Sequence, residues 1–522
     1  MNIAVTSQEM KKAEGYMIDR LGLPSLVLME KAAEKVFEAV QSLPDKTPHP
    51  VVSVLCGCGN NGGDGLAVAR IMHQKGIDVS VCIIGDESRA TDEFKLQKSI
   101  FEKLGGKIDI NPLYRCDLII DAMLGIGIKG EVRSPYRETI IELNSYHNLS
   151  ENNAQVPAVI SVDIPSGLDA DKGFAAGCAV NADVTVCLGC IKTGLLLNEG
   201  PLYAGKVLRD DIGINPPSDF SALVPETDDI KLIFPKRTIL SNKSTYGKVA
   251  IIAGSEGMPG AAVLATKASM TSGVGMSRLL TDPSILPTIV STMPEVMTDS
   301  YSCITPGTDD KSTLNTRSID SAIDWCDALL IGPGLGRSSQ AEELFLYVME
   351  KCNKPMVIDA DGLFHLSVHM DLLKNRQKNT TIVTPHPGEF CRLFGTVPGD
   401  KKHQDIEFVK ALSAKNNITI LAKDCSSIIT DGENVYINTF GTDALATAGT
   451  GDVLAGIVLT MLVNCIKNNG SETSCSLVNA CITGAALHGL SGIKASAKTN
   501  EYAVTASDVA SCIPEAVDYF TT

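Results

Sequence analysis

The amino-acid sequence predicts an α/β protein of two three-layer domains, each with a parallel sheet covered by helices on both faces. Its 522 residues exceed the roughly 250–300 that a single hydrophobic core usually supports. Short apolar runs that end in Gly, Asp or Pro alternate with helical stretches in both halves. This alternation breaks between about residues 213 and 240, where prolines stand among acidic residues. We therefore expect domains at residues 1–215 and 226–522, joined by an exposed linker.

The first half opens with a helix near residues 7–18, because Thr6-Ser-Gln-Glu9 has the pattern of a capping box. A glycine-rich loop, residues 57–65, precedes a second helix at about residues 66–74. The apolar runs predict five strands at residues 51–55, 79–84, 118–121, 159–163 and 184–188.

The second half repeats the alternation without repeating the sequence. Its candidate strands are residues 249–253, 328–331, 355–359, 381–384 and 418–422. Residues 427–430 and 434–438 predict a hairpin, because Asp431-Gly432 lies between two apolar runs.

Composition excludes several classes of function. The net charge of −16 argues against a broad basic surface for nucleic acid or anionic membrane. No apolar run is long enough to span a bilayer, and the first residues lack the pattern of a signal peptide. The 16 cysteines have no disulfide-like spacing, and the lone pair Cys187 and Cys190 does not make a zinc site. We expect a cytoplasmic protein with reduced thiols that binds neither nucleic acid nor membrane.

The most informative motif is Gly449-Thr-Gly-Asp452, which directly precedes a long apolar helical run. Glycines at a helix N-terminus let an anion approach the free backbone N–H groups, and the helix dipole favours its charge. An adjacent carboxylate can accept a proton from a substrate hydroxyl, so the motif is typical of phosphoryl transfer to an alcohol. The alternative is an ordinary helix capped by Asp452.

Other loops after strands in this half are also rich in glycine, at residues 254–260, 332–336, 359–362 and 384–389. Ligands bind at the carboxyl ends of strands in open α/β sheets. His386 lies between two prolines on one of these loops, which favours contact with a ligand over a place in the core.

These motifs, in this order, resemble the ribokinase-like NAD(P)H-hydrate dehydratase family across residues 226–522. The resemblance implies a ribokinase-like sheet and conversion of the S form of hydrated NADH or NADPH back to the coenzyme, with ADP or ATP and Mg²⁺. It implies that Asp452 is the catalytic base and that Gly451 binds the transferred phosphate. The remaining implied residues are His386, Gly334 and Ala262 for the hydrated dinucleotide, and Lys423, Asp424, Cys425, Ser426 and Ser427 for the nucleotide.

The chain departs from the dehydratase pattern just before the tetrad. Many relatives carry Asn-Pro-Gly upstream and two adjacent glycines, whereas here Thr442-Asp-Ala-Leu445 and Ala448-Gly449 occupy these places. Because alanine adopts a positive φ less easily than glycine, this departure bears on the geometry of the loop.

Polar side chains also follow three strands of the first half. Asn60, Asn61 and Asp64 lie in the first glycine-rich loop, Asp121 ends a strand before residues 125–130, and Asp163 ends another before Pro165-Ser-Gly. Such oxygen-bearing side chains can converge on a cation and a polar substrate. The alternative is that the aspartates only cap loops.

This set resembles the NAD(P)H-hydrate epimerase family across about residues 1–215, with a Rossmann-like parallel sheet. The resemblance implies that Asp163 is the catalytic carboxylate and that Asn61, Asp121 and Ser166 bind K⁺. The family opening Met-Glu-Asn-Ala is Met29-Glu-Lys31-Ala here. Lys129 is the nearest candidate cation for Asp163. The implied substrate-binding residues are Asn60, Asn61, Gly62, Gly63, Asp64, Gly125, Ile126, Gly127, Ile128, Lys129, Gly130 and Glu131.

The leading hypothesis is thus a bifunctional, homo-oligomeric enzyme that repairs the hydrated coenzymes NADHX and NADPHX. An alternative is a ribokinase-like kinase of a vitamin precursor that carries a non-catalytic N-terminal binding module. In a third hypothesis, the first half is a binding module such as occurs in an mRNA-decapping scaffold. The sequence leaves the choice between ADP and ATP open.

Overall fold

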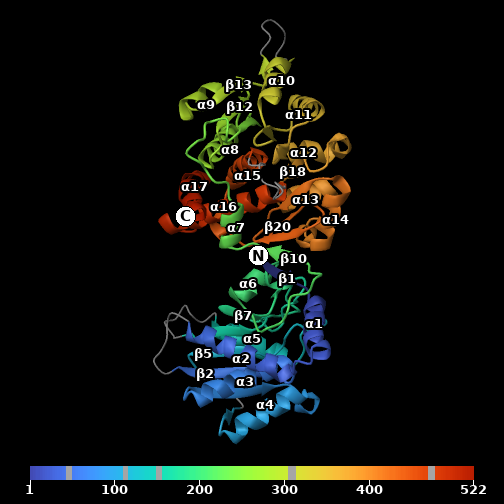
Figure 1. The fold of residues 1–522 in the computed structure, drawn as a ribbon, viewed down its shortest axis with the longest axis vertical. Coiled ribbons are helices and arrows are strands. Elements are labelled where there is room, and N and C mark those ends of the chain that lie inside the picture. Colours follow the sequence, from blue (N-terminus) through green and yellow to red (C-terminus); the bar gives the residue numbers. More distant parts are fainter. Residues whose placement is uncertain (43–49, 110–115, 148–155, 304–312, 468–476) are drawn as a thin grey trace. The chain divides into compact units, whose positions relative to one another are not determined.

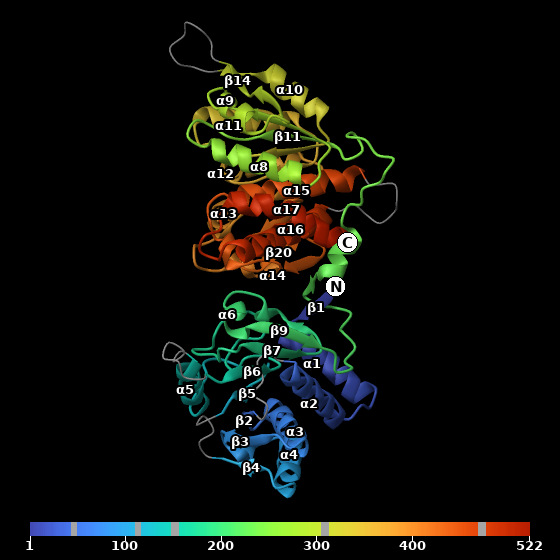
Figure 2. The same ribbon diagram turned by 90° about the vertical axis from the view of Figure 1, so that its left-hand side faces the viewer.

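The computed structural model describes residues 1–42, 50–109, 116–147, 156–303, 313–467 and 477–522. The chain forms two compact units, one of residues Asn2–Ala222 and one containing Leu223–Thr522. Figures 1 and 2 show each unit as a sheet flanked by helices. We describe each unit by itself.

The sheet of the first unit is parallel throughout and has the strand order β4-β3-β2-β5-β6-β7-β9. The strands are β2 (Val51–Gly57), β3 (Asp78–Ile84), β4 (Lys107–Ile108), β5 (Leu118–Ala122), β6 (Ala158–Val162), β7 (Val184–Leu188) and β9 (Lys206–Asp210). In addition, β1 (Asn2–Val5) pairs in parallel with β8 (Ile191–Lys192). The five predicted strands are confirmed, and the edge strands β4 and β9 are additional.

Helices cover both faces of this sheet, and their bounds are α1 (Ser7–Gly15), α2 (Ser25–Gln41), α3 (Asn60–Gln74), α4 (Asp92–Lys103), α5 (Tyr136–His147) and α6 (Gly200–Ala204). Alternate residues of β2 face opposite layers. Val52 and Val54 join the core that α2, α3 and α4 cover, whereas Leu55 joins the core under α5. The predicted capping box of α1 is present, since Thr6 and Glu9 bond each other's backbone N–H groups.

The prediction of a loop at residues 57–65 is wrong from residue 60 onward, because α3 already begins at Asn60. Its glycines provide space for packing. A Cβ atom on Gly62 would lie 1.6 Å from the Gly57 carbonyl oxygen, and one on Gly65 would lie 2.5 Å from Ala122 Cβ. The helix therefore approaches β2 and β5 as closely as bare backbone permits.

The sheet of the second unit has the order β13-β12-β11-β16-β17-β18-β19-β20-β21-β10. Its strands are β10 (Ala222–Val224), β11 (Lys248–Ile252), β12 (Met276–Thr281), β13 (Met297–Ser300), β16 (Ala328–Ile331), β17 (Met356–Ile358), β18 (Thr381–Val383), β19 (Thr419–Ala422), β20 (Ser427–Thr430) and β21 (Val435–Asn438). The strands from β13 to β19 are parallel, and β20 and β21 form the predicted antiparallel hairpin. The predicted strands are confirmed, whereas the patterns missed β12 and β13. A small antiparallel pair joins β14 (Ser302–Cys303) to β15 (Thr313–Leu314).

Helices form a layer on each face of this second sheet. One layer contains α8 (Pro259–Thr271), α15 (Thr450–Lys467), α16 (Leu477–Lys498) and α17 (Ala506–Thr521). The other contains α10 (Thr316–Trp325), α11 (Ser339–Lys351), α12 (Asp361–Val368), α13 (Pro387–Phe394) and α14 (Ile406–Asn416), as Figure 1 shows. The short α9 (Leu286–Thr292) lies beside β13.

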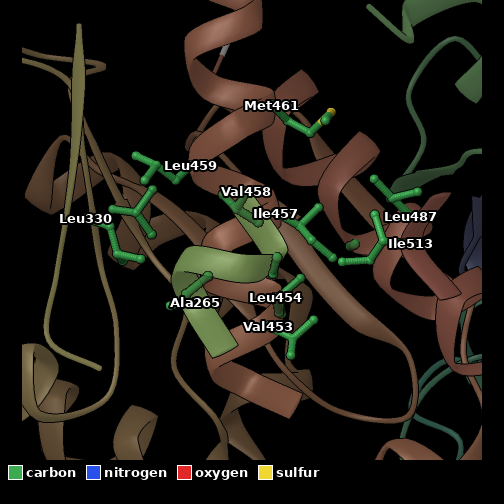
Figure 3. Packing of buried hydrophobic residues seen from close by; sticks show 14 of the residues in the cluster. Ala265, Leu330, Val453, Leu454, Ile457, Val458, Leu459, Met461, Leu487 and Ile513 are labelled. Atoms are coloured by element: carbon green, nitrogen blue, oxygen red, sulfur yellow. The ribbon is translucent and has the colours of Figure 1, made fainter. Parts of the chain in front are cut away.

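Helix α15 lies at the centre of the second core (Figure 3). Its side chains Val453, Ile457 and Val458 are fully buried and pack among residues of α8, α16 and α17. By length and composition α15 could cross a membrane, but 72% of its apolar window is buried in this core. Its hydrophobicity is therefore explained by the packing of the unit.

The expected structureless linker at residues 213–240 is wrong. The segment contains β10, which pairs with β21 through Leu223 and Tyr436, and helix α7 (Thr227–Ile233). Ile230 and Phe234 are buried in the core of the second unit. Prolines and acidic residues hid these elements, because Pro225 ends the strand and Asp228 and Asp229 occupy the first turn of the helix.

Candidate active sites

The two candidate sites lie where the strand order of each sheet reverses. In the first unit the chain proceeds outward from β2 to β4 and then continues on the other side of β2 with β5. In the second unit β11 and β16 have the same relation. Loops that leave two such strands diverge in opposite directions, so ligands bind between them.

A network of buried oxygen atoms occupies the reversal point of the first unit. Asp121 is fully buried and accepts hydrogen bonds from Ser166 N–H (2.8 Å), Ser166 Oγ (2.5 Å), Ser161 Oγ (2.8 Å) and Met123 N–H (3.2 Å). Burial raises the pKa of Asp121, although these hydrogen bonds oppose the shift. Among the described residues no basic side chain pairs with this carboxylate.

Asn61 lies beside this network. A Cβ atom on Gly125 would lie 3.4 Å from Asn61 Cβ and 3.8 Å from its Oδ1, and the buried Nδ2 has no hydrogen-bond partner among the described residues. Ser166 Oγ also approaches the Leu124 carbonyl oxygen at 3.2 Å. These amide, carboxylate, hydroxyl and carbonyl oxygens suit a hard cation, and an additional positive charge would compensate the buried Asp121.

Asp163 forms an ion pair with the fully buried Lys192 and also accepts a hydrogen bond from Leu188 N–H at 3.1 Å. The prediction that Lys129 is the cation nearest to Asp163 is therefore wrong, since Lys129 is exposed and Lys192 contacts the carboxylate. Burial tends to lower the pKa of Lys192, but Asp163, together with Cys187 and Glu14, outweighs burial and raises that pKa. Asp163 has a φ of 69°, a left-handed conformation that non-glycine residues rarely adopt.

Two more carboxyl groups lie close to this ion pair. Burial raises the pKa of Asp64 well above its usual value, and Asp163 and Glu14 raise it further. Burial also raises the pKa of Glu14, with a further contribution from Asp163. The structure thus gathers Asp64 from α3 and Glu14 from α1 around Asp163. At residues 125–131 the chain contains exposed positions at Gly127, Lys129, Gly130 and Glu131, so this part of the expected substrate set is open to solvent.

In the second unit, the tetrad begins α15 as the sequence predicts. Gly449 has a φ of 90°, and Thr450 is the first helical residue. Ala448 is not among the residues with positive φ, so this departure from the family pattern does not strain the loop. The other departure, Lys31, is exposed and lies against Gly213, outside the network around Asp121.

Asp452 lies in the first turn of α15 with a strongly altered proton affinity. Burial raises the pKa of Asp452 to about 7, and Asp359 contributes to the shift while Lys423 opposes it. A carboxylate with this pKa can accept a proton from a substrate hydroxyl near neutral pH.

Lys423 connects Asp452 with two other carboxylates. Its Nζ atom lies 3.0 Å from Asp359 and 3.9 Å from Glu389, and Thr384 Oγ1 donates to Asp359 at 2.7 Å. A Cβ atom on Gly451 would lie 3.4 Å from the same ammonium. The start of α15 therefore combines free N–H groups with a buried positive charge, which suits a phosphate.

A cavity of about 780 Å³ opens at this point. Five of the expected ligand-binding residues line it: His386, Lys423, Asp424, Cys425 and Ser427. Gly451 also lines it, whereas Ser426 is buried behind it, with its carbonyl accepting from Gln404 at 3.0 Å. His403 donates to Asp424 at 2.6 Å, and this contact lowers the pKa of Asp424 although burial opposes the shift.

Ala262 and Gly334 lie at the reversal point itself. Gly254 N–H donates to the Pro333 carbonyl at 2.8 Å, and Ser255 Oγ donates to the Gly334 carbonyl at 2.8 Å. A Cβ atom on Gly254 would lie 2.8 Å from Ala262 Cβ. The two residues are thus brought together, although neither lines the 780 Å³ cavity.

His386 is not a free loop residue, because it is the N-cap of α13. Its Nδ1 atom accepts from the backbone N–H groups of Gly388 (3.0 Å) and Glu389 (3.4 Å). The Glu389 carboxylate accepts in return from His386 N–H at 2.9 Å. The histidine side chain is 57% exposed, so its other ring nitrogen remains accessible.

Sequence reasoning assigned no role to Lys192, Asp359 or Glu389. Lys192 could have been found as the one charge in the apolar segment that follows β7, where an unpaired lysine would be costly. Asp359 and Glu389 stood within recognised motifs, but only the fold brings them to Lys423.

Each half of the chain matches a protein-family model. Residues 249–515, more than half of the chain, match the family model described as NAD(P)H-hydrate dehydratase. The chain belongs to the NAD(P)H-hydrate repair enzymes. Residues 25–194 match a second family model, the YjeF-related protein N-terminus.

Curated relatives in this repair-enzyme family match along most of the chain. The bifunctional NAD(P)H-hydrate repair enzyme Nnr of Salinibacter ruber is 32% identical, covering 87% of this chain and 86% of that protein. The enzyme of the same name from Moorella thermoacetica is 29% identical over 98% of this chain and 96% of its own. Among solved structures, the ADP/ATP-dependent NAD(P)H-hydrate dehydratase from Bacillus subtilis is similar, with a TM-score of 0.46 and 25% sequence identity. The match covers 57% of this chain and 99% of that chain.

Both halves of this NAD(P)H-hydrate repair enzyme therefore match enzyme relatives in one continuous chain, in the same order. This favours the bifunctional hypothesis over a vitamin-precursor kinase with a non-catalytic module, and over an RNA-related scaffold.

Proposed function

We propose that this chain repairs hydrated NADH and NADPH in two steps. The first unit interconverts the R and S hydrates, and the second unit dehydrates the S hydrate with ADP or ATP. Family membership supports the overall activity. The observation that carries the assignment of the second step is Asp452, a partly buried carboxyl with a pKa of about 7 at the start of α15, where Lys423 also lies.

In the second step, Asp452 takes the proton from the hydroxyl group of the hydrate. The hydroxyl oxygen then bonds to the terminal phosphorus of the nucleotide, and the bond to the nucleotide's bridging oxygen breaks. Lys423 and the N–H groups of Thr450 and Gly451 face the charge that develops on the phosphoryl oxygens. Departure of phosphate then breaks the carbon–oxygen bond, assisted by the lone pair of the ring nitrogen, which becomes an iminium nitrogen. Loss of a proton from the adjacent ring carbon to solvent forms the carbon–carbon double bond and restores the conjugated reduced ring.

Nucleotide binding is assigned to the cavity lined by Lys423, Asp424, Cys425, Ser427 and Gly451, with Ser426 supporting it from behind. No group of three or more His, Cys, Asp or Glu side chains with metal-binding geometry occurs among the described residues. Mg²⁺ is proposed to enter with the nucleotide and to be held largely by phosphate oxygens and water, as is usual for this ion. His386, Gly334 and Ala262 are assigned to the hydrated dinucleotide.

In the first step, Asp163 is assigned the proton movement at the hydrated carbon, with Lys192 fixing the carboxylate. K⁺ fits the oxygen atoms of Asn61, Asp121 and Ser166, where it would supply the positive charge that buried Asp121 lacks. The expected residues at 60–64 and 125–131 are assigned to the substrate, supported by the close approach of Asn61 to Gly125.

The test is a coupled assay with purified protein. S hydrate with ADP or ATP should restore the absorbance of the reduced nicotinamide ring. R hydrate with nucleotide should do so only through epimerisation, and faster in K⁺ than in Na⁺. If S hydrate is phosphorylated to a stable product, the chain is a kinase and the proposal fails.

We further propose a cytoplasmic homo-oligomer, in keeping with the acidic composition and the free state of the described cysteines. Light scattering after size-exclusion chromatography tests the oligomeric state, because a monomer mass would refute it. Fractionation of cells tests the compartment.

A further inference from the structure

The cap of α13 determines the chemical form of His386. Most N-caps are Ser, Thr, Asp or Asn, whose side chains have an oxygen acceptor. Here an imidazole nitrogen, His386 Nδ1, accepts from two backbone N–H groups. Only a nitrogen without a proton can do so, and a neutral imidazole with a free Nδ1 carries its proton on Nε2. The ring therefore exposes a hydrogen-bond donor.

Burial of the ring and two nearby cations favour this neutral form of His386, and one carboxylate opposes it. Lys423 and Arg392 act on His386 as like charges and Asp359 as an opposite one. Burial and Lys423 together lower the pKa of His386. A second proton would have to sit on Nδ1, facing the N–H groups of Gly388 and Glu389, so protonation would also break the cap.

Glu389 completes this arrangement from the third residue of the helix. One carboxylate oxygen accepts from His386 N–H at 2.9 Å, and the other lies 3.5 Å from Nε2. The Glu389 side chain is only 11% exposed, and it lies 3.9 Å from Lys423 Nζ. It thus contacts both the residue assigned to the hydrated dinucleotide and the lysine that lines the nucleotide cavity.

We propose that Glu389 is a positioning residue of the dehydratase, which holds His386 through the reciprocal cap so that Nε2–H donates to an oxygen atom of the hydrated coenzyme. The inference rests on the proposed function, because that function assigns His386 to this ligand. Glu389 itself touches no reacting atom in this scheme.

Kinetics of four variants test it: Glu389→Ala, Glu389→Gln, His386→Ala and the double alanine variant. Glu389→Ala should raise KM for the S hydrate about tenfold, as expected for one lost hydrogen bond, and change kcat less. Glu389→Gln keeps an oxygen acceptor for His386 N–H and should restore KM to within about threefold of wild type. The double variant should be no worse than His386→Ala. Multiplied losses would mean that Glu389 acts on the ligand directly and would overturn the proposal.

The ¹⁵N chemical shifts of the ring in ligand-free protein provide a second readout, with the signal assigned by its loss in His386→Ala. Wild type and Glu389→Gln should show the Nε2–H tautomer, and Glu389→Ala should show a mixture. A wild-type ring protonated on Nδ1 would overturn the inference even in a fully active enzyme. A wild type with the expected ring but no dehydratase activity would refute the proposed function instead.

Asn315→Ala is the matched control. Asn315 caps α10 in the same unit by accepting from Ser318 N–H at 3.2 Å. Its removal should lower stability as cap loss does, without changing KM for the hydrate or the His386 signal. An equal rise of KM in this control would attribute the Glu389 effect to helix fraying alone and would overturn the proposal.

Discussion

At the scale of single residues, both sites contain carboxyl groups whose proton affinity is altered by burial. Asp452 in one unit, and Asp64 with Glu14 in the other, all have a raised pKa. Such groups lower the stability of the fold at neutral pH, because the charged form is poorly solvated. For Asp452 this cost is accounted for by the proton transfer that we assign to it.

Asp452→Asn should reduce dehydration of the S hydrate by roughly 10²-fold or more, since an amide cannot take the hydroxyl proton. In wild type the rate should fall as the pH drops below about 7, where Asp452 becomes protonated. Near-normal turnover of the variant would remove Asp452 from the mechanism.

The same variant should alter stability in a pH-dependent way. The pKa of Asp452 is higher in the folded state (about 7) than its ordinary value of 3.8, so the folded form gains stability below pH 4 and loses it as the pH rises through 7. Asp452→Asn should therefore raise the free energy of unfolding by up to about 4 kcal/mol at pH 8 and hardly change it at pH 4. Urea titrations at both pH values measure this, and a loss of stability at pH 8 would contradict it.

A test of Asp163 needs a double substitution, because Asp163 is the ion-pair partner of the buried Lys192. Asp163→Ala would leave a fully buried ammonium group without its partner, at a cost of about 3–5 kcal/mol. The double variant Asp163→Asn with Lys192→Met removes both charges and should fold while losing R-to-S conversion. Dehydration of the S hydrate should remain at the wild-type rate in both cases. Epimerisation by the folded double variant would exclude Asp163 as the catalytic carboxylate.

At the scale of secondary-structure elements, the start of α3 is fixed by packing against β2. Gly62→Ala should destabilise the first unit by several kcal/mol, because the new Cβ atom would overlap the Gly57 carbonyl. Gly59→Ala is the matched control, since that Cβ atom would meet nothing within 4 Å and the φ of Gly59 is −95°. It should cost at most about 1 kcal/mol. Thermal unfolding of both variants makes the comparison, and equal losses would contradict the packing argument.

The residue at which the second unit begins can be tested with truncated chains. We propose that a chain starting at Ser221 retains dehydratase activity, because it includes β10 and all of α7. A chain starting at Asp229 lacks β10 and the Glu226 cap of α7, and should be less stable or aggregate. Equal stability of the two fragments, measured by thermal unfolding, would show that β10 is dispensable.

The sequence predicted the central strands because they are buried on both faces and therefore appear as continuous apolar runs. It missed β12 and β13 because polar and apolar residues mix there, as in Met276–Thr281, where the buried Ser277 and the partly exposed Arg278 interrupt the apolar run. It placed Asp452 and Asp121 correctly relative to their strands and helices. It could not give the ion-pair partners of Lys192 or Glu389, since ion pairs between distant elements have no local pattern.

At the scale of the whole molecule, the two steps should be separable between chains. A mixture of Asp452→Asn protein with the Asp163→Asn, Lys192→Met protein should clear R hydrate, although neither protein alone should do so. The reason is that the S hydrate released by the first protein is the substrate of the second. The assay is coenzyme recovery from R hydrate, corrected for spontaneous epimerisation, and no gain on mixing would mean that the intermediate is not exchanged.

The glycines of α3 also determine which positions a large-scale mutational screen of this protein would find intolerant to substitution. Gly62 belongs to the segment assigned to the hydrate and Gly65 follows it directly, yet each faces neighbouring atoms at a distance that leaves no space for a side chain. A screen of cellular abundance, which never measures turnover, would therefore mark this segment as intolerant. Asn60, exposed in the same turn, should be silent in that screen and appear only in a screen for coenzyme recovery. Comparing the two screens position by position would separate the residues that shape the binding surface from those that contact the coenzyme.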